Sequence, residues 1–190
     1  MTKSELRIIY KEKRQELSLA EIDKFNDLIL INFQKIKLPP IYCVHTYLAS
    51  LRLVEPDTAN IIRYLQFRNP DSKIAIPRID AASGNMHHYF LDENSQLVPN
   101  AFGIDEPDGG DIIPVEEIDL VLIPLLAFDK KGFRVGYGKG FYDRFLSECR
   151  SDVISIGLSF FDPVEAIDGV NDYDIPLQYC VTPKKLFPFY

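Results

Sequence analysis

The sequence holds few cysteines, and their positions exclude the sites that cysteines usually build. The three residues, Cys43, Cys149 and Cys180, are far apart and include no closely spaced pair of the kind that binds zinc. Their odd number also argues against a disulfide framework. We therefore expect reduced thiols, a cytoplasmic location and no metal site built on sulfur.

Long apolar runs and an excess of positive charge are also missing. The most apolar stretch, residues 119–128 ("DLVLIPLLAF"), is too short to span a bilayer. No apolar segment follows Lys3, Glu5 and Arg7, so we expect no signal peptide and no membrane partner. The formal net charge of −7 argues against a general nucleic-acid binder, although it leaves room for a local basic site.

What is present is the alternating pattern of an α/β protein. Two capping boxes, "TKSE" and "SLAE", predict a helix from Lys3 to about Leu17 and a second helix after Ser18. Further helices are predicted from near Asp57 and over 139–149. Strands are predicted over 41–48, 73–77, 86–91, 119–124 and 153–160.

This order of elements predicts one domain over residues 1–190, with a mostly parallel sheet and helices on both of its faces. Residues 104–114, rich in Asp, Gly and Pro, are expected to form a loop within it. Such sheets bind ligands beyond the carboxyl ends of their strands. The segment after the strong 119–124 strand is therefore the first place to look for a site.

That segment contains "FRVGYGKGFYDRFL", residues 133–146, at the start of a predicted helix. Gly136, Gly138 and Gly140 let backbone N–H groups approach an anion, and the helix N-terminus adds the positive end of its dipole. Lys139 adds a mobile charge. The spacing matches neither the Walker A loop nor the Rossmann fingerprint, and a plain tight turn is the alternative interpretation.

Several neighbouring side chains have both a functional and an ordinary interpretation. Arg134 suits a phosphate but also a solvated loop. Asp143 suits Mg²⁺, but a carboxylate in a first helical turn is favoured by the dipole alone. Phe141 and Tyr142 can flank a planar ring or pack in the core. His45 is interpreted as a hydrogen-bonded core residue, and the adjacent pair at 87–88 as ordinary strand residues that face opposite sides.

The combination of motifs resembles the 5-formyltetrahydrofolate cyclo-ligase family. Residues 123–146, "IPLLAFDKKGFRVGYGKGFYDRFL", contain the strand that ends in proline, the "AFD", the "G-x-R-x-G" turn and the "G-x-G-x-G" with its following Asp. The "K-x-x-L-R" at 3–7, the "E-x-D-T" at 55–58 and the "D-I-P" at 174–176 match as well. The likeness extends from Lys3 to Pro183.

The resemblance implies an ATP-dependent ring closure of 5-formyltetrahydrofolate to 5,10-methenyltetrahydrofolate, with ADP and phosphate as the other products and Mg²⁺ as the cofactor. It implies a monomer whose folate substrate carries one or more glutamates. It assigns ATP binding to Lys3, Ser4, Glu5, Leu6, Arg7, Arg134, Gly136, Gly138, Lys139, Gly140, Phe141, Tyr142 and Asp143. It assigns folate binding to Arg7, Glu55, Tyr137, Gly138, Lys139, Gly140 and Phe141, catalysis to Arg134 and Lys139, and Mg²⁺ binding to Asp143 and Asp174.

The sequence departs from the family pattern at several of these positions. Tyr137 stands where some members have arginine, and Phe141 replaces the commoner tyrosine, which removes a hydroxyl but keeps an aromatic ring. Two other functions compete with the enzyme: a module that binds folate or nucleotide without turnover, and a kinase-like or phosphosugar enzyme on a similar sheet. The cyclo-ligase is favoured over the first by the joint presence of Lys3, Arg7, Arg134, Lys139 and Asp143. It is favoured over the second by Glu55 and the aromatic residues after the glycines.

Overall fold

The structure, a computed structural model, describes residues 1–80, 83–100 and 103–189. The helices are α1 (Lys3–Gln15), α2 (Leu19–Phe33), α3 (Ala59–Arg68) and α4 (Phe141–Glu148), with a short 3-10 helix η1 (Val115–Glu117). The strands are β1 (Cys43–His45), β2 (Lys73–Ile79), β3 (Met86–Phe90), β4 (Leu97–Pro99), β5 (Asp105–Pro107), β6 (Leu120–Pro124), β7 (Ala127–Phe128), β8 (Arg134–Val135), β9 (Ile154–Leu158), β10 (Tyr179–Val181) and β11 (Leu186–Pro188).

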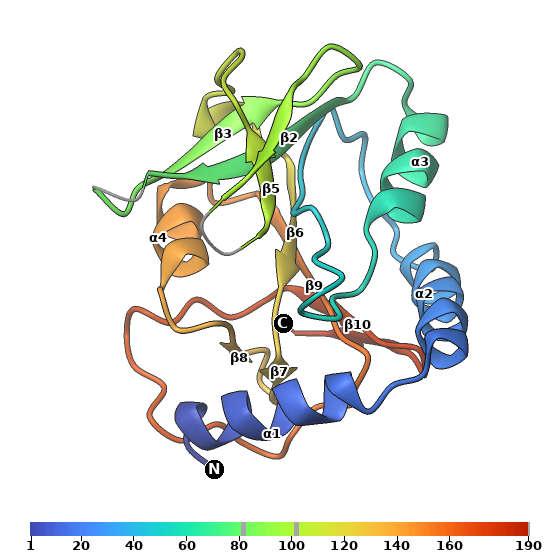
Figure 1. The fold of residues 1–190 in the computed structure, drawn as a ribbon, viewed down its shortest axis with the longest axis vertical. Helices are drawn as coiled ribbons and strands as arrows, with labels where there is room; N and C mark the ends of the chain where they lie inside the picture. The colour runs from blue at the N-terminus through green and yellow to red at the C-terminus, as the bar shows by residue number, and fades with distance from the viewer. Residues whose placement is uncertain (81–82, 101–102, 190) are drawn as a thin grey trace.

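The central sheet has the strand order β11-β10-β9-β6-β1-β2-β3 (Figure 1). The four inner pairings are parallel, whereas β3 and β11 pair antiparallel at the two edges. The sheet is therefore mostly parallel, as predicted from the alternation of strand and helix patterns.

Residues that alternate along the inner strands pack against different helices. Val44 and Leu122 belong to the apolar cluster that holds the buried residues of α2 and α3. Cys43 and Val121 belong to the opposite cluster, which holds Phe145 and its neighbours in α4. Because successive side chains in a strand point to opposite faces, helices cover both faces of the sheet, and the predicted α/β class is confirmed. Figure 1 shows α2 and α3 on one side and α4 on the other.

Both predicted capping boxes are present. Thr2 caps α1 and Ser18 caps α2, each with a glutamate three residues later that bonds back to the cap. Helix α1 lies along one end of the molecule beside β7 and β8 (Figure 1). Its Leu6 and Tyr10 are buried against Leu126 and Val135. This packing places the start of the chain next to the segment that follows β6.

Two predictions on element bounds were wrong. The strand expected over 41–48 is confined to Cys43–His45, because Tyr47 instead bonds to the segment that leads into α3. The expected loop over 104–114 contains β5, which pairs with β4 through mostly exposed residues. Within the described residues, no helix is both long and apolar enough to cross a membrane.

Candidate active site

The strand order reverses between β1 and β6, and this reversal locates the candidate site. From β1 the chain continues to β2 and β3 on one side, whereas from β6 it continues to β9, β10 and β11 on the other. In open α/β sheets, the loops leaving two such strands diverge and open a crevice at the carboxyl ends. The loop after β6 carries Gly136–Gly140, called here the glycine loop, and the loop after β1 carries Glu55.

The glycine loop ends in a helix start that exposes backbone N–H groups. Gly140 is the N-cap of α4 and has φ of +67°, a left-handed conformation that glycine adopts readily. No side chain among the described residues makes a capping hydrogen bond there. The first-turn amides of α4 are therefore available to an anion, as the sequence pattern predicts.

Helix α1 brings a cation to the same loop. Arg7 Nε donates a hydrogen bond to the Gly136 carbonyl at 2.9 Å. At Gly138, where φ is +96°, an added Cβ would lie 3.2 Å from the Arg7 Cζ atom. Glycine at this position therefore permits both the backbone conformation and the approach of the guanidinium.

If ATP binds the glycine loop, as the motif resemblance implies, we expect Gly138→Ala to weaken that binding. The new methyl group would push Arg7 away and strain the backbone by about 1–2 kcal/mol. Gly169→Ala is the matched control, because φ there is +79° and no atom lies within 4 Å of an added Cβ. Titration calorimetry with an ATP analogue should show at least a tenfold loss for Gly138→Ala and less than a twofold change for Gly169→Ala. Equal losses in the two variants would contradict a specific role for Gly138.

A buried arginine connects β8 to the start of α4. Arg134 is only 9% exposed. Its Nη2 donates to Asp143 Oδ1 at 2.8 Å, and its Nη1 donates to the Ile175 carbonyl at 2.5 Å. Burial lowers the pKa of Arg134, and the carboxylates of Asp143 and Asp174 offset part of this effect. The guanidinium is therefore fixed in place by its partners.

A second ion pair, between Lys3 and Asp174, lies next to the pair formed by Arg134 and Asp143. Lys3 Nζ lies 2.5 and 2.6 Å from the two carboxylate oxygens of Asp174. Burial would raise the pKa of Asp174, but hydrogen bonds from Lys3 and from the Asn171 N–H outweigh it, so that the pKa lies below its ordinary value. Lys3, Arg134, Asp143 and Asp174 thus form one charged cluster assembled from distant parts of the chain.

The remaining residues predicted from the N-terminal segment are placed differently. Leu6 is fully buried, so its side chain belongs to the packing of α1. Glu5 accepts hydrogen bonds from Thr2 in the capping box, and Ser4 is exposed on the same helix. Of this segment, Lys3 and Arg7 are the side chains that contact other predicted site residues.

The end of the glycine loop and the first residue of α4 contact Arg144, which was not predicted as a site residue. Arg144 donates to the Lys139 carbonyl at 3.2 Å, and its guanidinium lies 5.2 Å from the centre of the Phe141 ring. The Lys139 side chain is exposed. Tyr142 packs with the apolar cluster beneath α4, so Phe141 is the more accessible of the two aromatic residues for ring stacking.

Comparison with known proteins now identifies the relatives of this fold and site. A profile of the 5-formyltetrahydrofolate cyclo-ligase family matches residues 3–183. The chain belongs to this family. The cyclo-ligase of Escherichia coli K12 is 32% identical over 154 residues, which are 78% of this chain and 84% of that one. The Haemophilus influenzae cyclo-ligase is 42% identical over 147 residues, which are 67% of this chain and 78% of that one.

A solved structure supports the same assignment. The NMR structure of 5,10-methenyltetrahydrofolate synthetase from Aquifex aeolicus is 27% identical and gives a TM-score of 0.80. The superposition covers 99% of this chain and 93% of that one. This cyclo-ligase family member is therefore a ligase with the fold of its relatives, and the resemblance stated from the motifs is confirmed.

In this cyclo-ligase family member, Glu55 and Tyr137 meet across the crevice. The Tyr137 hydroxyl donates to Glu55 Oε1 at 2.7 Å, and Glu55 Oε2 accepts from the Ser50 N–H at 3.0 Å. The same hydroxyl accepts from Arg14 Nη1 at 3.1 Å. Arg14 was missed as a site residue, although its spacing of four from the buried Tyr10 was a signal that it lies on the inner face of α1.

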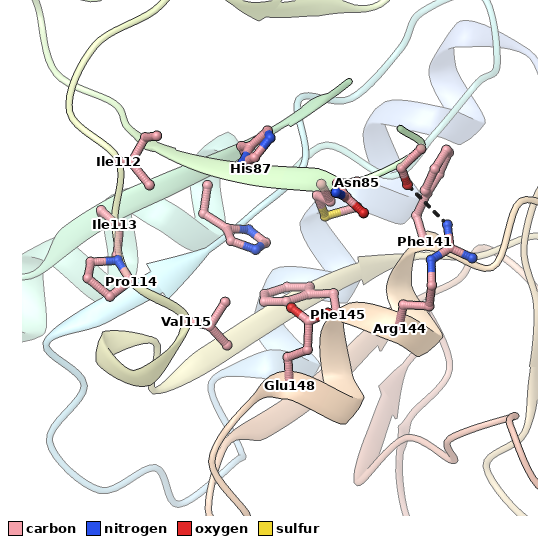
Figure 2. Close-up of a pocket in the computed structure, with 13 residues that line it drawn as sticks. Asn85, His87, Ile112, Ile113, Pro114, Val115, Phe141, Arg144, Phe145 and Glu148 are labelled. Atoms are coloured by element: carbon pink, nitrogen blue, oxygen red, sulfur yellow. Dashed lines mark hydrogen bonds between the residues drawn. The ribbon is translucent and has the colours of Figure 1, made fainter. Parts of the chain in front are cut away.

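A pocket of about 350 Å³ lies between β3, residues 112–115 and α4 (Figure 2). Of the predicted site residues, Phe141 lines it. His87 and His88 both line it, which was not expected of adjacent strand residues; the difference in burial is as expected, because His87 is exposed and His88 is buried. The interpretation of His45 as hydrogen-bonded was wrong, because neither ring nitrogen has a partner among the described residues.

The three thiols give no sign of reactivity. Burial raises the pKa of Cys43 and of Cys149 to about 12, and burial raises the pKa of Cys180 as well. All three cysteines are free. Protonated thiols are poor nucleophiles, so we assign the cysteines to packing.

Proposed function

We propose that this family member catalyses the ATP-dependent conversion of 5-formyltetrahydrofolate to 5,10-methenyltetrahydrofolate, with release of ADP and phosphate. One observation supports the proposal most strongly. In an acidic chain, Lys3 contacts Asp174 and Arg7 contacts the glycine loop, which leads into the uncapped start of α4. Such a concentration of donors suits a triphosphate.

The proposed reaction needs positioning more than it needs a protein nucleophile. The formyl oxygen attacks the γ-phosphorus, and the bond to the bridging oxygen breaks to release ADP. N10 then attacks the activated formyl carbon and loses its proton, and phosphate departs with the former formyl oxygen. Phosphate is a far better leaving group than the oxygen of a formamide. Arg134 and Lys139 are assigned to the charge that develops on the transferred phosphoryl group.

Glu55 is assigned to the pterin. An ionised carboxylate accepts paired hydrogen bonds, which suits the amino-pyrimidine edge of that ring. Its loop follows β1, whereas the glycine loop follows β6, so the two substrates would meet where the strand order reverses. Phe141 offers a ring face next to the same loop.

The acidic residues present fit a magnesium ion that arrives with the nucleotide. Both hydrogen bonds that Asp143 accepts go to Oδ1, so Oδ2 is without a recorded partner among the described residues. Asp174 would have to exchange its pairing with Lys3. No group of three metal-binding side chains occurs in the described part of the chain, and Mg²⁺ commonly uses one or two carboxylates with substrate phosphates and water. When bound, the ion would neutralise phosphate charge.

We expect Asp143→Asn to raise the Mg²⁺ concentration needed for half-maximal activity by about tenfold, because the amide keeps the shape but loses the charge. Asp152→Asn is the matched control, since that carboxylate pairs with Arg150 away from the site. A Mg²⁺ titration at saturating ATP measures the effect. An unchanged titration for Asp143→Asn would remove this residue from the metal assignment.

The proposed function is tested directly by incubating the purified protein with 5-formyltetrahydrofolate, ATP and Mg²⁺. The near-ultraviolet absorbance of the methenyl product should rise only when all three are present. One ADP should form for each product molecule. Folate binding without product, under any nucleoside triphosphate, would instead indicate a binding module.

A further inference from the structure

Arg14 is a charged residue in a place where charged residues are rare. It lies on the inner face of α1, four residues after the buried Tyr10, and is only 1% exposed. No carboxylate lies within ion-pair distance of it among the described residues. Burying an arginine without a direct ion pair is unfavourable unless its N–H groups are well used.

The two terminal nitrogens of Arg14 bind three separate segments, whereas Nε has no partner among the described residues. Nη2 donates to the Leu125 carbonyl, directly after β6, at 2.5 Å. Nη1 donates to the Leu53 carbonyl at 3.3 Å and to the Tyr137 hydroxyl at 3.1 Å. One guanidinium thus joins the end of β6, the turn before Glu55 and the glycine loop. Three acceptors in different directions suit the fixed fork of arginine and cannot all be served by lysine.

The Tyr137 hydroxyl connects Arg14 to Glu55 by two hydrogen bonds. It accepts from Arg14 and donates to Glu55 Oε1 at 2.7 Å. Burial and the Glu55 carboxylate raise the pKa of Tyr137, so the phenol keeps its proton and continues to donate. The other carboxylate oxygen is fixed by the Ser50 N–H. The carboxylate plane is therefore defined from two sides.

The turn that carries Glu55 has a strained backbone. Val54 has φ of +48°, and a β-branched residue rarely adopts that conformation. Strained residues persist only where surrounding contacts fix them, and they often lie next to functional groups. Here the fixing contacts are the Arg14 bond to the Leu53 carbonyl and the bonds between Ser50 and Glu55.

We propose that Arg14 is a positioning residue that acts through the Tyr137 hydroxyl to hold the Glu55 carboxylate in the orientation that receives the pterin. This inference rests on the proposed function and adds a residue to it. Tyr137, which stands where some family members have arginine, keeps its contact to the site through this hydroxyl. Arg14 itself touches neither substrate. Its effect is confined to the folate side, because Arg7 holds the Gly136 carbonyl independently.

The test is a double-mutant cycle with Tyr137→Phe and Arg14→Lys. Each single variant is expected to raise the KM for 5-formyltetrahydrofolate by roughly 10- to 50-fold, as loss of a hydrogen bond to a charged group implies. The KM for ATP should change by less than twofold. The double variant should lose little more than the worse single variant, because both substitutions break one chain of contacts.

The matched control is Tyr47→Phe. The Tyr47 hydroxyl is also buried and bonds the Pro56 carbonyl, next to Glu55, but it makes no recorded contact with the carboxylate. The Tyr47→Phe substitution should lower the melting temperature without altering the KM for 5-formyltetrahydrofolate. If the role of Arg14 is purely structural, Arg14→Lys and Tyr137→Phe will behave like Tyr47→Phe, with a lower melting temperature and an unchanged folate KM. That outcome would overturn the inference.

Each outcome of the cycle separates this inference from the proposed function. A wild-type protein that neither binds nor converts 5-formyltetrahydrofolate overturns both. An active wild-type protein whose Tyr137→Phe variant keeps its folate KM overturns the inference alone, as do additive losses in the double variant. If Arg14→Lys does not fold, Tyr137→Phe measured against Tyr47→Phe still decides.

Discussion

Replacement of Arg134 by lysine is expected to lower kcat for the proposed cyclisation by about 10²- to 10³-fold while the protein remains folded. Lysine keeps the positive charge, so Asp143 is not left unpaired. A single ammonium group cannot reproduce the two-sided geometry in which Arg134 contacts both Asp143 and the Ile175 carbonyl. The negative charge that develops on the transferred phosphoryl group would then be stabilised by a mobile ammonium group, which is less effective than a guanidinium fixed in position.

Arg150→Lys is the matched control for this prediction. Like Arg134, Arg150 bonds carboxylate and carbonyl oxygens, here the carboxylates of Asp119 and Asp152 and the Glu116 carbonyl, but it lies beyond the other end of α4. Steady-state kinetics and thermal melts of both variants should show comparable, modest stability losses and a fall in kcat for Arg134→Lys alone. A kcat within threefold of the wild-type value would refute the assignment of Arg134 to the transition state.

Acidification from pH 6.5 to about 4 is expected to destabilise the protein through two buried histidines. Burial lowers the pKa of His88 to about 4, with a further contribution from His87. Burial, and then the neighbouring His88, lower the pKa of His45 well below its ordinary value of 6.5. The two rings lie 4.9 Å apart in an edge arrangement, and His45 is also close to Phe145 and Tyr142.

The direction of the effect follows from proton counts. Well above pH 6.5 the histidines are neutral in both the folded and the unfolded chain. As the pH falls below 6.5, the unfolded chain binds protons that the folded chain does not, so the free energy of unfolding decreases. The loss is about 1.4 kcal/mol per pH unit for each histidine. For His88 it ends near pH 4, after roughly 3 kcal/mol.

The double variant His45→Phe, His88→Met is expected to flatten the dependence between pH 6.5 and 4. It also removes the buried ring nitrogens that have no hydrogen-bond partner among the described residues, so it should be at least as stable as the wild type at pH 7. His87→Gln is the control, because His87 is exposed. Urea unfolding at several pH values measures all three proteins. An unchanged slope in the double variant would assign the acid sensitivity to other groups.

The parts of the fold that sequence reasoning predicted are those in which local and tertiary preferences agree. The 119–124 strand is a continuous apolar run and is buried on both faces, so its pattern is unambiguous. The capping boxes of α1 and α2 are local hydrogen bonds. By contrast, β4 and β5 are mostly exposed, and β10 and β11 are three residues long, so their pairing depends on neighbours that are distant in sequence.

For the candidate site, the sequence predicted residue types better than their partners. Lys3 and Arg7 were predicted as site residues from the "K-x-x-L-R" motif, but only the structure shows that they contact Asp174 and Gly136. Arg14 was not predicted as a site residue, because a charged residue on a helix is normally exposed. Its burial depends on three acceptors supplied by other segments, which no local pattern encodes.

The ion pair between Lys3 and Asp174 spans 171 positions of the chain. A polypeptide emerging from the ribosome therefore presents its first lysine long before the matching carboxylate has been translated. We therefore expect the proposed nucleotide site to be complete only after residue 174 has been synthesised. A tag fused directly ahead of α1 is expected to disturb this pair, because Lys3 is only two residues from the start of the sequence and the Met1 amine itself pairs with Asp168.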